Sequence, residues 1–323
     1  MRLDRFQKLA LSTTVATYLL IAVGGLVRAA GAGLGCPDWP RCFDRWIPPT
    51  DVSQVPSHID PALFNFAKAW TEYVNRLVGV TVGFLIFATL VLAWRHHRKS
   101  PRVFWPTVAS FVLVGVEGWL GGQVVRSGLH SLVLTAHLVL ALVIVSLLLY
   151  ATVTAFFPGG RVDVPLSKER RTLGRAALGV FALTLVQVGI GAFVRGDIQE
   201  LAKTELARAE WITQLGTIDI VHRQVAALTT LAVLGLVWMV FRHAERDVWL
   251  RGFSTASAVL VGGQAAAGLG LAYFAVPPVL QVAHLWLSSL LLGALTVVAM
   301  LAYRVDPRWV MGDSRSQVNP SEK

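Results

Sequence analysis

Charged residues are scarce in this chain. Only 15% of its 323 residues are Asp, Glu, Lys or Arg, and 54% are apolar, whereas a soluble domain carries about 25% charged residues. This composition excludes a disordered protein and argues against an ordinary cytosolic enzyme. Cysteine is also scarce: two residues cannot cross-link a fold of this size, although they can close one loop.

Long apolar segments recur along the whole chain. Eight stretches of about 20 residues, bounded by charged clusters, are each long enough to cross a bilayer as an α-helix. We therefore predict an all-α integral membrane protein with eight transmembrane helices. The first span is not expected to be a cleaved signal peptide, because it lacks a small-residue cleavage site and continues into Arg28. The predicted spans are 9–27, 74–94, 103–124, 132–154, 173–194, 218–241, 253–273 and 279–303.

The positive charge is unevenly distributed between the two sides of these spans. Nineteen of the 29 Lys and Arg residues fall on one side, and the remaining ten are balanced by ten acids. The positive-inside rule places the richer side, with both termini, in the cytoplasm. The net charge of +10 thus reflects topology, and nucleic-acid binding is not expected. The rich segments are the N-terminal tail, 95–102, 157–175, 242–251 and the C-terminal tail.

Both cysteines lie in the long segment 28–73, which this orientation places on the outer face. In an oxidising compartment a short disulfide between Cys36 and Cys42 is expected, and Pro37 and Pro40 favour a turn between them. Two unpaired thiols are the alternative. A metal site is disfavoured, because two thiols without a nearby histidine offer too few ligands.

The two halves of the chain match at a constant spacing of 147 residues. Four helices per copy keep both copies in the same orientation, so we predict a parallel repeat of two four-helix bundles, 1–156 and 157–323. Gly24 and Arg28 match Gly191 and Arg195 at a spacing of 167, because the first outer loop is longer. The pairs at 147 are Glu72 with Asp219, Asn75 with His222, Arg76 with Arg223, Glu117 with Gln264, Gly121 with Gly268 and His137 with His284.

Three histidines lie inside predicted spans, each near the outer end of an even-numbered helix: His137, His222 and His284. Ionisable residues in a membrane are costly and mark functional candidates. His222 and His284 are on different helices at one depth, so we predict that they bind a heme iron through both axial positions. Hydrogen bonding between helices is the alternative. A zinc site is disfavoured, because each half lacks three suitable ligands.

Polar residues near these histidines extend the candidate site. Glu72 shares a helix face with Asn75 and can move protons or stabilise a developing cation near a heme edge; an acid that only interacts with a helix dipole is the alternative. Glu117 is the only acid well inside a span, and its role is left open. Four arginines near outer helix ends are candidates for binding propionates, although such residues also extend to headgroups: Arg28, Arg76, Arg195 and Arg223.

Several short motifs occur in order along nearly the whole chain. They are GGLVRAAGAGLGCPDWPRC after the first span, WTEYVNRLVG opening the second, GGQVV-x-SGL and TAH around the fourth, GAFVR ending the fifth, VHR opening the sixth and QVAH opening the last. Together they resemble the heme A synthase family of bacterial inner membranes and mitochondria. The first motif, with its Gly-rich turn and Cys pair, is highly specific.

The resemblance implies a bacterial inner-membrane enzyme that oxidises a ring methyl of heme O to a formyl group, giving heme A for cytochrome c oxidase. It implies that His222 and His284 hold heme b and that Glu72 and His137 belong to the substrate site. It also implies an outward-facing Cys loop, heme O from a heme O synthase farnesyltransferase, and an electron acceptor. A homo-oligomer in the lipid bilayer is compatible with it.

The chain departs from the family pattern at two places. Asn75 stands where the family has its other front-half histidine, so a front-half heme would keep one imidazole, His137, and one open face. An open face suits oxidation chemistry, whereas two imidazoles suit electron transfer. The segment 196–217 also lacks the cysteine pair that some members carry there.

Two other functions compete with this one. A heme b cytochrome that only transfers electrons would account for His222, His284 and the arginines, but not for Glu72 beside a single His137. A transporter built on a parallel repeat would have broken helices near mid-membrane, for which only the Gly-rich stretch 262–270 is a candidate.

Overall fold

The computed structural model describes residues 3–156, 167–244 and 247–304, and these ranges form an all-helical protein. Each of its eight long helices is long and apolar enough to cross a membrane, so the protein is a multi-pass membrane protein. The helices are α1 Arg5–Ala29, α2 Phe66–His97, α3 Pro101–Arg126, α4 Ser131–Phe156, α5 Lys168–Leu201, α6 Thr217–His243, α7 Val248–Tyr273 and α8 Pro278–Ala302. Three short 3-10 helices lie in the loops: η1 Val52–Gln54, η2 Pro61–Leu63 and η3 Arg208–Gln214.

All eight predicted spans are confirmed as helices, but two helices extend well beyond their apolar segments. Helix α2 begins at Phe66 rather than at residue 74, because the side chain of Asn65 accepts the backbone N–H of Lys68 at 3.0 Å and caps the helix there. Helix α5 continues to Leu201 rather than ending at residue 194. Hydropathy marks the membrane-crossing length, whereas a cap determines where the helix begins.

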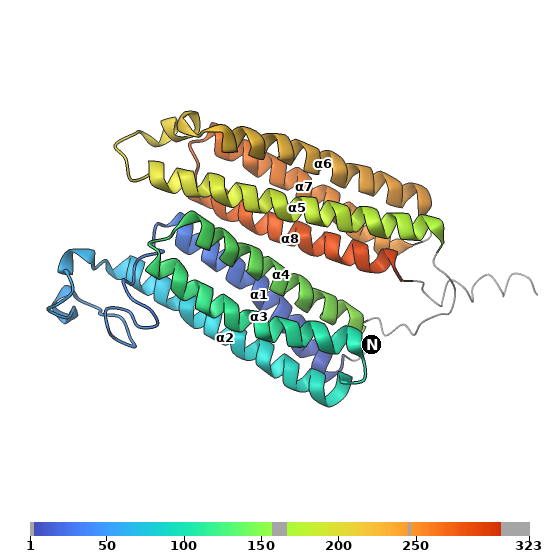
Figure 1. Cartoon of the computed structure of the whole chain (residues 1–323), viewed down its shortest axis with the longest axis horizontal. Helices are drawn as coiled ribbons and strands as arrows, with labels where there is room; N and C mark the ends of the chain where they lie inside the picture. The colour runs from blue at the N-terminus through green and yellow to red at the C-terminus, as the bar shows by residue number, and fades with distance from the viewer. Residues whose placement is uncertain (1–2, 157–166, 245–246, 305–323) are drawn as a thin grey trace, which may run out of the picture.

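The helices form two groups of four that lie side by side (Figure 1). Helices α1–α4 make one group, which we call the front half, and α5–α8 make the other, the back half. Helix α8 lies between them and packs against α1 and α4 as well as its own group, so most of it is buried. Close contacts fix this junction: the indole N–H of Trp286 donates to the backbone oxygen of Tyr18 at 3.2 Å.

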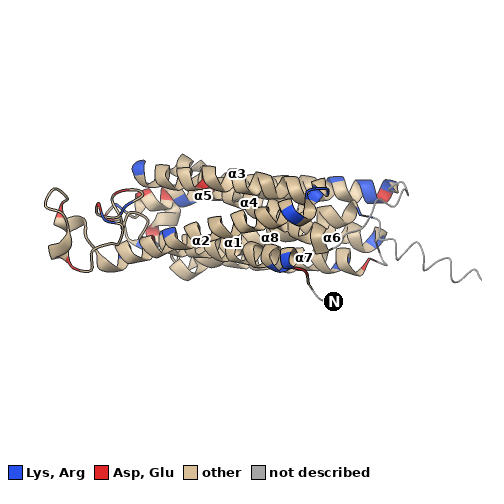
Figure 2. Cartoon of the chain, turned by 90° about the horizontal axis from the view of Figure 1, so that it is seen from below, with Lys and Arg blue, Asp and Glu red and all other residues tan. Residues whose placement is uncertain are grey.

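Charged residues gather toward the two ends of the molecule, and its middle is almost free of them (Figure 2). The start of α1 and the long loop 30–65 lie at opposite ends (Figure 1). The outer ends of the helices are therefore defined here as the ends near that loop. Part of the predicted charge asymmetry, in residues 157–166, 245–246 and 305–323, lies outside the described residues.

Candidate functional site

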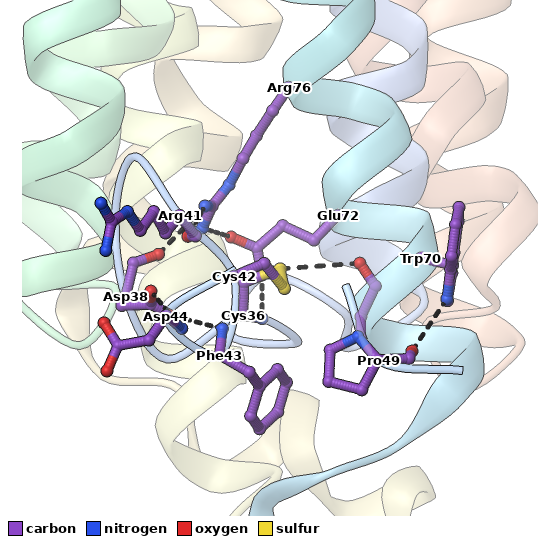
Figure 3. Close-up of a disulfide and its surroundings, with 11 residues drawn as sticks. Cys36, Asp38, Arg41, Cys42, Phe43, Asp44, Pro49, Trp70, Glu72 and Arg76 are labelled. Carbon is purple, nitrogen blue, oxygen red and sulfur yellow. Dashed lines mark hydrogen bonds and ion pairs between the residues drawn. A yellow bond between two sulfur atoms is a disulfide. The ribbon is translucent and has the colours of Figure 1, made fainter. Parts of the chain in front are cut away.

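The predicted disulfide between Cys36 and Cys42 is present, and it folds the start of the long loop onto the front half (Figure 3). Both cysteines are buried. Gly35 lies so close to the backbone of Lys68 that a Cβ has no space there, and a Cβ at Gly122 of α3 would meet the Trp39 ring at 3.0 Å. The disulfide loop thus packs against the outer ends of α2 and α3.

Glu72 connects this loop to α2. Its carboxylate accepts the backbone N–H of Cys36 at 2.9 Å and pairs with Arg76 at 2.5 Å. The Arg76 guanidinium in turn donates to the carbonyls of Asp38 and Arg41 (Figure 3). Only 4% of Glu72 is exposed. The alternative that Glu72 merely interacts with the helix dipole is wrong, because α2 begins well before it and no acid lies in its first turn.

The two predicted back-half ligands face each other. The imidazole centroids of His222 on α6 and His284 on α8 are 6.5 Å apart, and their planes are inclined at 68°. Two nitrogen–metal bonds of about 2 Å, plus roughly 1 Å from each nitrogen to its ring centre, give a separation of about 6 Å for a metal held between two imidazoles. The observed spacing therefore fits an axially ligated heme iron.

Each back-half ring is held by the helix that precedes its own. On α5, the side-chain amide of Gln187 lies 3.0 Å from Nδ1 of His222, and a Cβ at Gly191 would be 2.8 Å from Cε1. On α7, the backbone oxygen of Gln264 lies 3.2 Å from Nδ1 of His284. At His284 the facing group is an acceptor, so Nδ1 carries the hydrogen and Nε2 is the nitrogen that this ring offers to a metal. At His222 the facing atom is the amide nitrogen of Gln187, whose Oε1 is buried without a partner in the described chain.

The same support recurs in α7 and, in the front half, in α3. A Cβ at Gly268 would be 3.2 Å from Cε1 of His284, and one at Gly121 would be 3.5 Å from Cε1 of His137. Nδ1 of His137 lies 3.1 Å from Oε1 of Glu117. In all three cases the residue that faces Nδ1 lies four positions before the glycine that faces Cε1. The two residues are therefore one helical turn apart, on one face of the supporting helix.

The fourth repeat-related position, on α2, has neither the histidine nor the contacts that hold it. Asn75 replaces the histidine on α2, and its Oδ1 is buried without a hydrogen-bond partner in the described chain. On α1, Leu20 stands where α5 has Gln187. Gly24 corresponds to Gly191, yet nothing lies within 4 Å of the place where its Cβ would be. The front half therefore brings one imidazole, not two, to its site.

The four predicted arginines occupy two kinds of environment. Nε and Nη2 of Arg28 are buried without partners in the described chain, and Nη2 of Arg195 donates to the backbone oxygen of Arg28 at 3.4 Å. The Arg195 guanidinium on α5 therefore reaches the last turn of α1, where the halves join. By contrast, Arg76 pairs with Glu72, and Arg223 pairs with Asp219 at 2.8 Å.

Sequence analysis missed the contacts that α3, α5 and α7 make with the histidines. The spacing of Glu117 from Gly121, and of Gln264 from Gly268, was visible as part of the repeat. Its meaning was not, because a contact between neighbouring helices leaves no local sequence signal. Within residues 3–156, 167–244 and 247–304, no cluster of three or more His, Cys, Asp and Glu side chains is placed to hold a metal ion.

The fold and these rings define a multi-pass helical membrane protein in which two imidazoles, from helices on opposite corners of the back half, face each other. The chain belongs to the COX15-CtaA family, described as cytochrome oxidase assembly protein, whose model matches residues 7–296.

Similar proteins include three that are named heme A synthase. That of Geobacillus kaustophilus is 27% identical and covers 91% of this chain and 90% of its own length. That of Shouchella clausii is 26% identical, covering 92% and 97%, and that of Maricaulis maris is 28% identical, covering 91% and 97%.

Proposed function

We propose that this protein is a heme A synthase, which oxidises a ring methyl of heme O to the formyl group of heme A. Membership of the family over residues 7–296 and the names of its full-length relatives support this proposal. The structural observation that carries it is the 6.5 Å separation of the His222 and His284 rings beside a second, single-histidine site at His137.

In this proposal the back half holds a heme b through His222 and His284. A heme with two imidazole ligands is coordinatively saturated and supplies a redox centre for electron transfer. Arg28 and Arg195 bind propionate carboxylates, because Arg28 has buried guanidinium nitrogens without a partner in the described chain. Arg76 and Arg223 form the second propionate pair, although each already contacts a carboxylate.

The front half receives heme O as substrate on His137. Asn75 and the open space at Gly24 leave the opposite face of the substrate accessible. With water as the source of the formyl oxygen, oxidation of the methyl group releases protons and electrons, so the reaction requires a proton acceptor and an electron acceptor. Glu72 is the proposed proton acceptor, because it is a buried carboxylate on the same helix face as Asn75.

We also propose the membrane arrangement. The 147-residue spacing and the two groups of four helices support a parallel repeat with halves 1–156 and 157–323. The charge asymmetry supports cytoplasmic termini and an outward-facing disulfide loop in a bacterial inner membrane. A heme O synthase farnesyltransferase would supply the substrate, and self-association of the chain is compatible with this arrangement.

Extraction of the hemes tests the proposal directly. The full-length protein is purified from cells that supply heme O, and its hemes are extracted with acidic acetone and separated. We expect heme b together with heme O or heme A, and His137→Ala should keep heme b but lose heme A. Heme b alone would favour the electron-transfer cytochrome. That function is the specific competitor, because Asn75 stands where the family has a front-half histidine. A heme-free protein would overturn both.

A further inference from the structure

The three histidines differ in the group that faces Nδ1. At His222 it is the neutral amide of Gln187, and at His284 it is the backbone oxygen of Gln264. At His137 it is the carboxyl group of Glu117, 3.1 Å away. The repeat places Glu117 and Gln264 at corresponding positions, so the front half has a carboxyl group where the back half uses its backbone.

We propose that Glu117 is a positioning residue for His137. It accepts a hydrogen bond from Nδ1–H, keeps Nε2 free for the iron of the substrate, and makes His137 a stronger electron donor than either back-half ligand. This inference rests on the proposed function, because it concerns how the front half binds heme O.

A metal-binding histidine has a second partner at the ring nitrogen that does not bind the metal, and this partner affects the strength of the metal bond. Such a ring donates its other N–H to an acceptor, which fixes the tautomer and ring orientation and raises the basicity of the ligand. A hydrogen bond to an ionised acceptor is about twice as strong as one between neutral groups. A carboxylate therefore moves more electron density onto the imidazole than an amide or a backbone carbonyl does.

The burial of Glu117 supports a specific role for this carboxyl group. Its side chain is only 14% exposed, and Oε2 is buried without a partner in the described chain. An acid at membrane depth is costly and is retained for function. The side chain of His137 is 37% exposed, so part of the ring remains uncovered while Nδ1 meets Glu117.

The contact is close but not aligned in this structure. The two atoms are within ion-pair distance, yet the N–H of His137 does not point at Oε1 well enough to form a hydrogen bond. A turn of the imidazole aligns the pair. Gly121 permits this movement, because even a Cβ there would meet Cε1 at an ordinary contact distance of 3.5 Å.

The experiment compares Glu117→Gln with the unchanged protein, both full length and loaded with heme O. The first readout is the iron–histidine stretching band of the ferrous front-half heme in the resonance Raman spectrum. The second is the midpoint potential of each heme. We expect Glu117→Gln to lower the frequency of the band and to shift the front-half potential to more positive values, while the back-half potential stays the same.

Gln264→Ala is the matched control. It removes the corresponding side chain of the back half but keeps the backbone oxygen that faces His284, so both readouts should be unchanged. A Glu117→Gln protein that binds heme O with an unaltered band and potential overturns the inference alone. Failure of the unchanged protein to bind heme O overturns the proposed function instead.

A second comparison applies if Glu117→Gln does not accumulate. In His222→Ala reconstituted with heme b, the back-half iron keeps only His284, which a backbone oxygen supports. The front-half band of the unchanged protein should then lie at higher frequency than the back-half band of this variant. Equal frequencies would overturn the inference.

Discussion

The front and back halves each pack four helices together but differ in the groups that surround their histidines. The back half keeps two imidazoles, and each has a neutral group at Nδ1. The front half keeps one imidazole, faced by a carboxyl group, and has Asn75 in place of the other. In the proposed function, these differences adapt one half to a saturated metal centre and the other to a centre with an open face.

The outer ends of the two halves also differ in how deeply their acid–arginine pairs are buried. In the front half, the disulfide loop is bonded to Glu72 and Arg76, which are both largely buried. In the back half, Asp219 and Arg223 at the corresponding positions pair with each other, and over half of the Arg223 side chain is exposed. The front half thus encloses its acid beneath a cross-linked loop, whereas the back half does not.

Removing a back-half ligand should give the largest effect. We expect His222→Ala and His284→Ala each to abolish the low-spin heme b signal, because a heme held by one imidazole loses both affinity and its low-spin state. Optical and electron paramagnetic resonance spectra measure this. His243→Ala, an exposed histidine at the other end of α6, is the control. Unchanged spectra in both ligand variants would refute the back-half assignment.

Neutralising the front-half acid should give the next largest effect. Glu72→Gln should reduce heme A formation by about 100-fold or more, the scale of general acid–base catalysis, while heme b content stays constant. The matched variant Asp219→Asn, at the corresponding back-half position, should change neither quantity appreciably, because partly exposed ion pairs contribute about 0–1 kcal/mol. Product analysis after heme O loading measures both.

Glu72 also anchors the disulfide loop, so its two roles must be separated. The double variant Cys36→Ser, Cys42→Ser removes the cross-link but keeps the carboxylate. If Glu72 acts only as an anchor, this variant and Glu72→Gln will lose heme A formation to the same extent. A proton-transfer role requires that Glu72→Gln lose activity even when the loop remains resistant to proteolysis.

The helices and the histidine pair were predictable from the sequence because apolar length and repeat spacing are recorded along the chain. The Cys36–Cys42 disulfide was predictable for a similar reason, since the two residues are close in sequence. The contact between Glu72 and the N–H of Cys36 was not, because it depends on how a long loop returns to α2. The start of α2 was also missed, because the Asn65 cap lies outside the apolar pattern.

The coordination of the front-half heme provides a third test. With heme O bound, the ferric front-half iron should be high-spin and should bind cyanide, whereas the back-half iron should not, because both its faces are taken. Asn75→His should convert the front-half signal to low spin. A loaded protein whose hemes are all low-spin and inert to cyanide would show that another residue fills the open face; His130, which is exposed just before α4, is the first candidate.

The smallest effect should come from adding a single methyl group to corresponding glycines. A Cβ at Gly191 would lie 2.8 Å from Cε1 of His222, so Gly191→Ala must displace the ring from its place beside α5. Overpacking of this kind costs about 1–3 kcal/mol, and we expect weaker heme b retention with an altered low-spin spectrum.

Gly24→Ala is the matched control, because nothing lies within 4 Å of that Cβ, and alanine favours a helix interior over glycine by about 1 kcal/mol. It should therefore leave the spectrum unchanged and preserve or increase thermal stability. Equal spectral effects of the two variants would mean that a front-half side chain also packs against α1 at Gly24. The proposed difference between the halves at this position would then be wrong.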